Sequence, residues 1–563
     1  MTNDQKREPT PVDTIAEEWV DTQLELYPEF HVWLGRPGRE GEYADYSPAG
    51  AEHAIAKVKE ALARIEAAEP VDDIDRVTKM DLTRELQLTV EKHEAGFAQR
   101  DLNVIASPAQ ELRDIFDLVP TDTEDDWANV SKRLHNLPAA MDGYIETLRS
   151  GIQAGNVPAI RQVREVLAQA RKQVANTGFF YEFTADAKPL NGVLPESLKA
   201  DLADGAQQAA QAYATLADFF ENELAQHAPE KDAVGRELYA LASRGFLGAT
   251  VDLDETYEWG IEELARMRAE QESIANEIKP GASVLEAIEF LDGDPSRKLH
   301  GTDALQRWMQ ETSDRAIEEL GRSHFDIPAE IRRLECMIAP TQEGGIYYTG
   351  PSDDFARAGR MWWSVPEGVT EFDTWRELTT VYHEGVPGHH LQIAQATYNK
   401  AQLNSWRRIA GTSGHAEGWA LYAERLMEQL GYLDDPADRL GMLDGQRMRA
   451  ARVVLDIGVH LEKPLPDGSR PWTGEDAFPF LRENVNMNDG FVRFEVNRYL
   501  GWPGQAPSYK IGQRIWEQLR DEYARREGAS FDIKAFHKKA LDIGGVGLDT
   551  LKSALLDGTR LHR

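Results

Sequence analysis

The chain contains 563 residues, of which 41% are hydrophobic and 28% are charged, a composition typical of a globular protein rather than a disordered one. Its formal net charge of −34 disfavours nucleic acid and anionic membrane surfaces as binding partners. The single cysteine, Cys336, excludes an intrachain disulfide bond and a cysteine-rich metal site.

The N-terminal segment, Met1–Pro9, is polar and lacks the apolar stretch of a secretion signal. The rest of the sequence contains no apolar run of membrane-spanning length. These two observations predict a cytoplasmic protein without a membrane partner.

The segment 12–333 has the periodicity of α-helices. Apolar residues recur at spacings of three and four, as in Ala54–Ile65 and Val163–Val174. Proline and glycine fall between such runs, for example at Pro280 and Gly281. Because neither a short repeat nor a low-complexity linker divides the chain, we expect a single domain.

The pattern changes between residues 334 and 366, where short β-prone segments alternate with turn residues. Strands are predicted at 334–339, 345–349 and 360–365. We therefore expect a small antiparallel sheet directly before a histidine-rich segment.

Helical periodicity resumes after these strands and continues to a last helix that runs through Leu555. The next helices are predicted at 372–386, 391–404 and 416–429. The sequence thus predicts a mainly α fold in one domain of residues 1–563. Its parts are a helical N-terminal part (12–333), a core with the small sheet and a metal site (334–515), and C-terminal helices (516–563).

Three histidines and a glutamate lie within eight residues, at His383, Glu384, His389 and His390, and Glu417 follows further along the chain. Two histidines and a glutamate are a familiar ligand set for a catalytic zinc ion. A glutamate directly after the first histidine is placed like the general base of a zinc hydrolase. We therefore predict one zinc ion held by two histidines and Glu417, with Glu384 as the catalytic base.

The spacing departs from the usual His-Glu-x-x-His because Pro387 occupies its fifth position. Proline lacks an N–H and collides with the carbonyl four residues earlier in a helix, which here belongs to His383. Either Pro387 and Gly388 form a distorted turn that brings His389 back, or a straight helix presents His390 about 10.5 Å further along its axis. The proline favours the distorted turn, so we take His389 as the ligand and His390 as the alternative.

The chain between the histidines and Glu417 is long enough for a helix, a loop at Gly411–Gly414 and a returning helix. Such a return would bring Glu417 to the histidines. Glu424 shares its helix face at a spacing of seven residues, and it is a candidate for orienting a histidine ring.

These segments resemble the bacterial family labelled domain of unknown function 885. The matching segments are His383-Glu384-x-x-Pro387-Gly388-His389-His390-Leu391-Gln392, Glu417–Glu424, Asp456–His460, Arg498-Tyr499 and Pro503–Gly512. The family is similar in fold to mostly helical zinc carboxypeptidases of the gluzincin type, so the resemblance implies a large helical metallopeptidase-like fold. Carried over to this sequence, it implies His383, His389 and Glu417 as zinc ligands and Glu384 as the base.

Cleavage of an amide requires a hydrogen-bond donor to the oxyanion besides the metal. Tyr509, in a segment rich in glycine and proline, and His460 are the predicted catalytic partners of Glu384, and Tyr499 is a further candidate. On a helix, Asp456 would be placed to orient the ring of His460 four residues later.

A carboxypeptidase must also bind the free C-terminal carboxylate of its substrate, and arginine and lysine do this best. Arg452, Arg498 and Lys510 are the cations near the motifs. If the predicted strand 345–349 borders the cleft, it could pair with an extended peptide.

These features predict a zinc-dependent hydrolase of short peptides, of carboxypeptidase or small oligopeptidase type. One alternative is a metal-dependent hydrolase of a non-peptide amide or ester, since activated water attacks any such carbonyl. The other is a non-catalytic peptide-binding protein that has lost the metal. Pro387 favours this last alternative, whereas the intact Glu384 argues against it.

Overall fold

The computed structural model describes residues 6–339 and 345–557. Within these ranges the chain is mainly helical, as predicted, and its strands form two small sheets. The first five and the last six residues of the expected domain lie outside the described residues. None of the helices in the described ranges is both long and apolar enough to cross a lipid bilayer.

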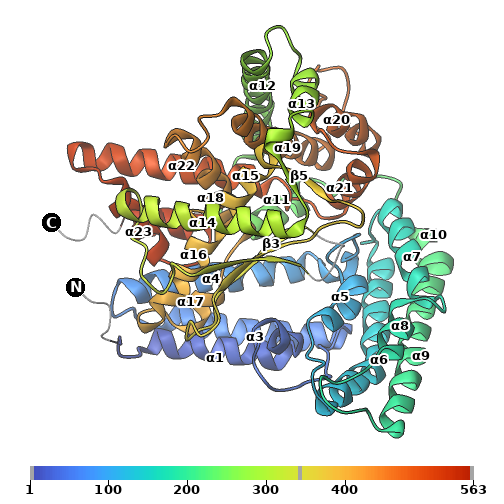
Figure 1. Cartoon of the computed structure of the whole chain (residues 1–563). Coiled ribbons are helices and arrows are strands. Elements are labelled where there is room, and N and C mark those ends of the chain that lie inside the picture. Colours follow the sequence, from blue (N-terminus) through green and yellow to red (C-terminus); the bar gives the residue numbers. More distant parts are fainter. Residues whose placement is uncertain (1–5, 340–344, 558–563) are drawn as a thin grey trace.

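Four N-terminal helices, blue in Figure 1, pack around a first apolar core. Thr10 starts the first of them by accepting a hydrogen bond from the N–H of Asp13. Trp19, Ile55 and Leu82 are buried in the core between these helices. The four are α1 (Pro11–Leu26), α2 (Glu29–Trp33), α3 (Pro48–Ala67) and α4 (Asp73–Glu94).

A second group of helices stands on the right of Figure 1 and has an apolar core of its own. The predicted periodic run Val163–Val174 lies in one of these helices, where Val163, Val166 and Ala170 are buried. The group consists of α5 (Pro108–Asp114), α6 (Glu124–Ala154), α7 (Ile160–Val174), α8 (Phe179–Ala185), α9 (Glu196–Phe219) and α10 (Ala225–His227).

The remaining helices surround a third and larger apolar core, except α17 (Ser405–Ile409), whose Trp406 is buried in the first core. Four of them precede the metal-ligand candidates: α11 (Arg236–Leu247), α12 (Leu253–Ile278), α13 (Val284–Asp292) and α14 (Thr302–Ser323). Ten follow: α15 (Thr374–Glu384), α16 (His389–Tyr398), α17 (Ser405–Ile409), α18 (Ser413–Gln429), α19 (Pro436–His460), α20 (Ala477–Asn484), α21 (Asp489–Gly501), α22 (Ser508–Glu527), α23 (Ile533–Asp542) and α24 (Leu548–Leu556).

The small sheet predicted before the histidine-rich segment is present. Its strands are β2 (Leu334–Ile338), β3 (Ile346–Thr349) and β4 (Gly359–Trp363), in the order β2-β4-β3. The β3–β4 pair is antiparallel as predicted, whereas β2 runs parallel to β4. A second, antiparallel pair joins β1 (Lys298–His300) to β5 (Glu371–Asp373), and β5 leads directly into α15.

The two predicted helices that flank Pro387 differ in their boundaries from the observed helices. The helix predicted over 372–386 begins at Thr374 and already ends at Glu384. The helix predicted over 391–404 begins earlier, at His389, and ends earlier, at Tyr398, and α17 begins beyond the predicted range. The chain break around Pro387 accounts for the ends at Glu384 and His389, which lie on its two sides.

Candidate metal centre

A short break between α15 and α16 arranges the histidines. α15 ends at Glu384 and α16 begins at His389, with four irregular residues between them. A Cβ atom on Gly388 would lie 1.8 Å from the carbonyl oxygen of His383, so only glycine fits there. This is the distorted turn expected at Pro387 and Gly388, and it brings His389 back to His383.

Three consecutive residues of α18 contact three different parts of the site. Glu417 faces the histidines. Gly418 lets α22 approach closely, because a Cβ atom on it would lie 2.4 Å from the carbonyl carbon of Gly512. The indole N–H of Trp419 donates a 2.9 Å hydrogen bond to the carbonyl of Pro387 and so holds the break between the two histidine-bearing helices.

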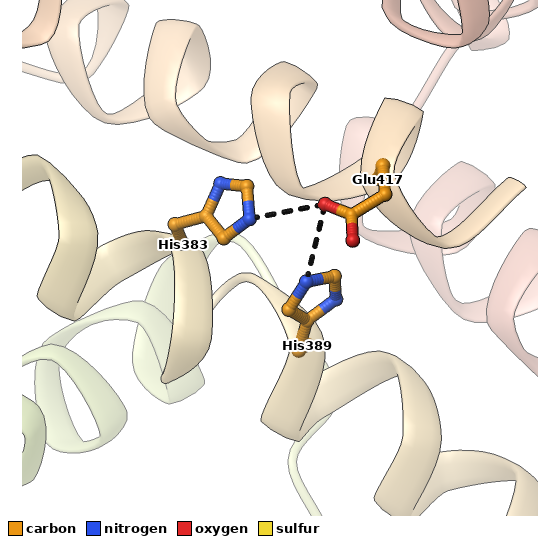
Figure 2. A group of neighbouring side chains, drawn as sticks. All are labelled: His383, His389 and Glu417. Carbon is orange, nitrogen blue, oxygen red and sulfur yellow. Dashed lines mark ion pairs between the residues drawn. The ribbon is translucent and has the colours of Figure 1, made fainter. Parts of the chain in front are cut away.

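His383, His389 and Glu417 meet around one point, as Figure 2 shows. The Nε2 atoms of His383 and His389 lie 3.3 and 3.5 Å from Oε2 of Glu417. All three ligand atoms lie within 4.8 Å of one another, and no other such group of potential ligands occurs in the described ranges. The three predicted ligands therefore come together from α15, α16 and α18.

The two distances from Glu417 to the histidine nitrogens match the ligand spacing around a tetrahedral metal ion. Zinc bound to nitrogen and oxygen at about 2.0–2.1 Å separates neighbouring ligand atoms by about 3.4 Å. In addition, the Oε2 atom of Glu417 is buried and makes no hydrogen bond to any described residue. Because a buried carboxylate oxygen needs a partner, a cation between the three residues would satisfy it.

The pKa shifts of His383 and Glu417 also indicate that positive charge is favoured between the three residues. Burial lowers the pKa of His383, but the carboxylates of Glu417 and Glu424 outweigh burial and raise that pKa to about 10. Burial acts to raise the pKa of Glu417, yet His389 and His383 hold it well below its ordinary value. Without a metal the site therefore attracts a proton, and a metal cation supplies the same charge.

A carboxylate behind His383 fixes the orientation of its ring. Nδ1 of His383 lies 2.7 Å from Oε1 of Glu424, and the hydroxyl of Thr379 donates a 3.0 Å hydrogen bond to the other oxygen. With Nδ1–H donated to Glu424, Nε2 is left as the ligand atom. His389 has no such support in the described part of the chain, where its buried Nδ1 is unpaired.

The alternative ligand, His390, is turned away from the site. The hydroxyl of Tyr348 lies 2.9 Å from its Nδ1, and the carbonyl of Ile331 lies 2.6 Å from its Nε2. Burial lowers the pKa of His390 to about 4, so the ring is neutral at pH 7. Since both ring nitrogens have partners in the sheet region, the geometry favours His389 as the ligand.

Glu384, the predicted base, borders a cavity of about 400 Å³ together with His383. Burial raises the pKa of Glu384, which makes its carboxylate a stronger base. Part of the cavity wall is apolar. The apolar residues of the lining are Ile346, Trp375, Met448, Val485 and Met487.

Tyr509, predicted to donate to an oxyanion, lies close to the ligands in the first turn of α22. Burial is the main cause that raises its pKa to about 12, and the charge of Glu417 adds to this. Its phenol therefore stays protonated and remains a donor at neutral pH. Its hydroxyl makes no hydrogen bond to any residue that the structure describes.

The structure does not bring His460, the other predicted catalytic group, to the metal ligands. His460 is fully buried, with Nε2 3.0 Å from the carbonyl of Tyr499. It lies about 16 Å along α19 from Arg449, which lines the cavity. The nearby Asp456 accepts hydrogen bonds from Tyr239 and from the backbone of Gly504, so this pair belongs to the packing of the core.

The three predicted carboxylate-binding cations have carboxylate partners within the chain. Lys510 lies 3.0 Å from Glu263, and Arg452 and Arg498 share Glu495.

The sequence prediction missed a fourth cation, Arg449, which lines the cavity. A pattern in the sequence of α19 does indicate its position. The cavity-lining residues of α19 are Gly441, Asp444, Gly445, Met448 and Arg449. Their spacings of three and four define one helix face. On this face Gly441 lets the backbone of Trp375 approach closely, and Gly445 leaves room for the guanidinium of Arg449. An arginine four residues after the second glycine is therefore placed at the edge of the cavity.

Comparison with known proteins identifies the family of the chain. Residues 28–555 match the profile of the family described as "bacterial protein of unknown function (DUF885)", and the chain belongs to this family. A search of curated proteins finds no match.

Two solved structures share the fold. The crystal structure of a "putative lipoprotein" from Colwellia psychrerythraea is 21% identical, with a TM-score of 0.83 over 98% of both chains. A "putative lipoprotein of unknown function" from Shewanella oneidensis is 18% identical, with a TM-score of 0.76 over 97% of this chain and all of the other. At such identities the likeness establishes the fold alone.

Proposed function

We propose that this DUF885 protein is a zinc-dependent hydrolase of short peptides, with Glu384 as its general base. One observation carries the proposal: three buried ligand atoms surround a single point, and the base candidate borders a cavity beside them. The complete set of three ligand residues argues against a protein that has lost its metal.

Two histidine nitrogens and one carboxylate oxygen are a ligand set that suits zinc and leaves a position open for water. A zinc ion held by His383, His389 and Glu417 would lower the pKa of that water and polarise the substrate carbonyl. Glu424 would keep the ring of His383 oriented, and Trp419 would keep the two histidine-bearing helices in register.

Glu384 would then move the proton that hydrolysis requires. Its carboxylate accepts a proton from water as the water oxygen bonds to the carbonyl carbon of the substrate. The carbon–nitrogen bond breaks, and the protonated Glu384 returns the proton to the leaving amine. Water is consumed, and an acid and an amine are formed. The raised pKa of Glu384 favours this exchange, since burial makes the carboxylate hold a proton more readily.

Tyr509 is the candidate donor to the oxyanion that forms when water adds. Its phenol stays protonated, and it lies close enough to Glu417 for that carboxylate to raise its pKa. A donor that does not ionise at neutral pH can stabilise negative charge on the former carbonyl oxygen throughout the reaction.

A peptide substrate is supported by the strand beside the cavity. In the described ranges β3 pairs only with β4, so one edge of β3 is unpaired, and Ile346 of β3 lines the cavity. An extended peptide can add to such an edge through backbone hydrogen bonds. The cavity of about 400 Å³ has the size of a small-molecule site, which suits short peptides better than folded proteins.

The proposal is tested by Glu384→Gln, which keeps the shape of the side chain and removes the base. We expect about one zinc per chain in both proteins, with peptide hydrolysis reduced at least 100-fold in the variant. Glu428→Gln is the matched control, because Glu428 lies one turn beyond Glu424 and pairs with Arg425. Equal hydrolysis by Glu384→Gln and the wild type would refute the base, and a protein that binds no zinc would refute the enzyme.

A further inference from the structure

Arg449 differs from the other arginines of its helix because it has neither an ion pair nor a hydrogen bond to a described residue. On α19, Arg439 pairs with Glu277 and Arg452 with Glu495. Arg447 donates a hydrogen bond to Gln271. Arg449 makes no hydrogen bond or ion pair with any residue in the described ranges, although the chain has 96 acidic residues against 62 basic ones.

The guanidinium of Arg449 carries hydrogen-bond donors without an acceptor among the described residues. It is partly buried, and its Nε atom is buried without a hydrogen-bond partner. Its guanidinium carbon lies 6.0 Å from the ring centroid of Tyr509. The Nε of Arg439 is also unpaired, but the guanidinium of Arg439 pairs with Glu277, whereas Arg449 has no such carboxylate partner in the described ranges. A guanidinium at a cavity wall without an ionic partner can bind an anionic group of a ligand.

Arg449 also lies beside the catalytic candidates. It lines the same cavity as His383 and Glu384. An anion bound by Arg449 would therefore lie near the scissile bond rather than at a remote end of a long substrate.

We propose that Arg449 binds the free C-terminal carboxylate of the peptide and so makes the enzyme a carboxypeptidase that releases one residue. This inference rests on the proposed peptidase function. A planar guanidinium holds a carboxylate through two parallel hydrogen bonds, which is the geometry that a chain terminus requires. The apolar part of the cavity, formed by Trp375, Met448, Val485 and Met487, receives the side chain of the released residue.

The test compares N-benzoylglycyl-phenylalanine with its C-terminal amide, a pair that differs only in the group bound by Arg449. The wild type is expected to cleave the acid about 100-fold more efficiently than the amide, in kcat/KM. In Arg449→Met this preference falls to about one, through loss of activity on the acid alone, while zinc content is unchanged. Arg449→Lys keeps the charge and should lie between the two.

Arg439→Met is the matched control, because Arg439 is on the same helix and pairs with Glu277. It should cleave both substrates like the wild type. If the wild type cleaves acid and amide equally well, or if Arg449→Met loses activity on both alike, the carboxylate anchor is wrong while the hydrolase stands.

A protein that cleaves neither substrate would refute the peptidase, and binding then decides the anchor separately. Calorimetry on the zinc-loaded protein measures the affinity for the acid and for the amide. Tighter binding of the acid that disappears in Arg449→Met supports the anchor without the reaction. Equal binding of acid and amide overturns it.

Discussion

Nδ1 of His383 lies 2.7 Å from Oε1 of Glu424, and this contact sets which ring nitrogen faces the metal position. Glu424→Gln keeps the shape of the side chain but removes its charge. We expect zinc affinity to fall about tenfold, measured by competition with a chromophoric chelator, because the ring loses basicity and orientation. Glu428→Gln, one turn further along α18, should leave the affinity unchanged. Wild-type affinity in Glu424→Gln would show that the contact does not support the metal.

Gly388→Ala tests the break between the two histidine-bearing helices. The added Cβ would lie 1.8 Å from the carbonyl oxygen of His383, so the backbone must move and His389 must move with it. We expect loss of zinc binding and a lower Tm. Gly411→Ala is the control, since a Cβ at Gly411 meets nothing within 4 Å, and its stability should change by no more than about 0.5 kcal/mol. Normal zinc content in Gly388→Ala would contradict the role of the break.

Tyr509→Phe removes the hydroxyl that we assign to the oxyanion. Loss of one such donor typically lowers kcat by about 100-fold or more, whereas the metal ligands are untouched. Steady-state kinetics should therefore show a lower kcat with unchanged zinc content. Tyr523→Phe, in the same helix but packed against Phe536, should keep wild-type kinetics. A fall in zinc content as large as the fall in kcat would assign Tyr509 to metal binding instead.

The buried ring of His537 is expected to make the free energy of unfolding depend on pH. Its ring stacks on Phe325, with the Tyr422 hydroxyl 2.8 Å from its Nε2, and burial lowers its pKa to about 3. Below pH 6.5 the unfolded chain binds a proton at His537 that the folded protein does not bind. The stability that depends on a neutral His537 is therefore fully present above pH 6.5 and is lost as the pH falls towards 3. Between pH 6.5 and 5 the loss amounts to about 2 kcal/mol.

Urea unfolding at these two pH values checks this expectation in His537→Gln, which should lose less stability on acidification than the wild type. His300→Gln, at an exposed position, is the control and should behave like the wild type. Equal losses in His537→Gln and the wild type would show that His537 is protonated in the folded protein.

The ligands could be predicted from the sequence because their pattern is local. His383, Glu384 and His389 lie within seven residues, and the helix-breaking chemistry of Pro387 already indicated a distorted turn. The choice between His389 and His390 could not be settled in this way. It depends on Tyr348 and Ile331, which lie 42 and 59 residues earlier in the chain and take up both nitrogens of His390.

The same limit explains where the structure differs from the sequence-based expectation around the site. Whether Lys510 is free depends on Glu263, nearly 250 residues away, and no local pattern reveals that pair. The parallel pairing of β2 with β4 joins strands that are not consecutive in the chain, whereas the antiparallel β3–β4 pair joins consecutive strands. His460 has the right spacing from Asp456, but its position along α19 carries it away from the cavity.

Anomalous X-ray scattering at the zinc absorption edge, from crystals grown with one equivalent of zinc, tests the metal centre most directly. The account predicts one strong peak bounded by Nε2 of His383, Nε2 of His389 and Oε2 of Glu417, with His390 still beside Tyr348. Zinc bound only elsewhere, or a peak that requires His390 as a ligand, would contradict it.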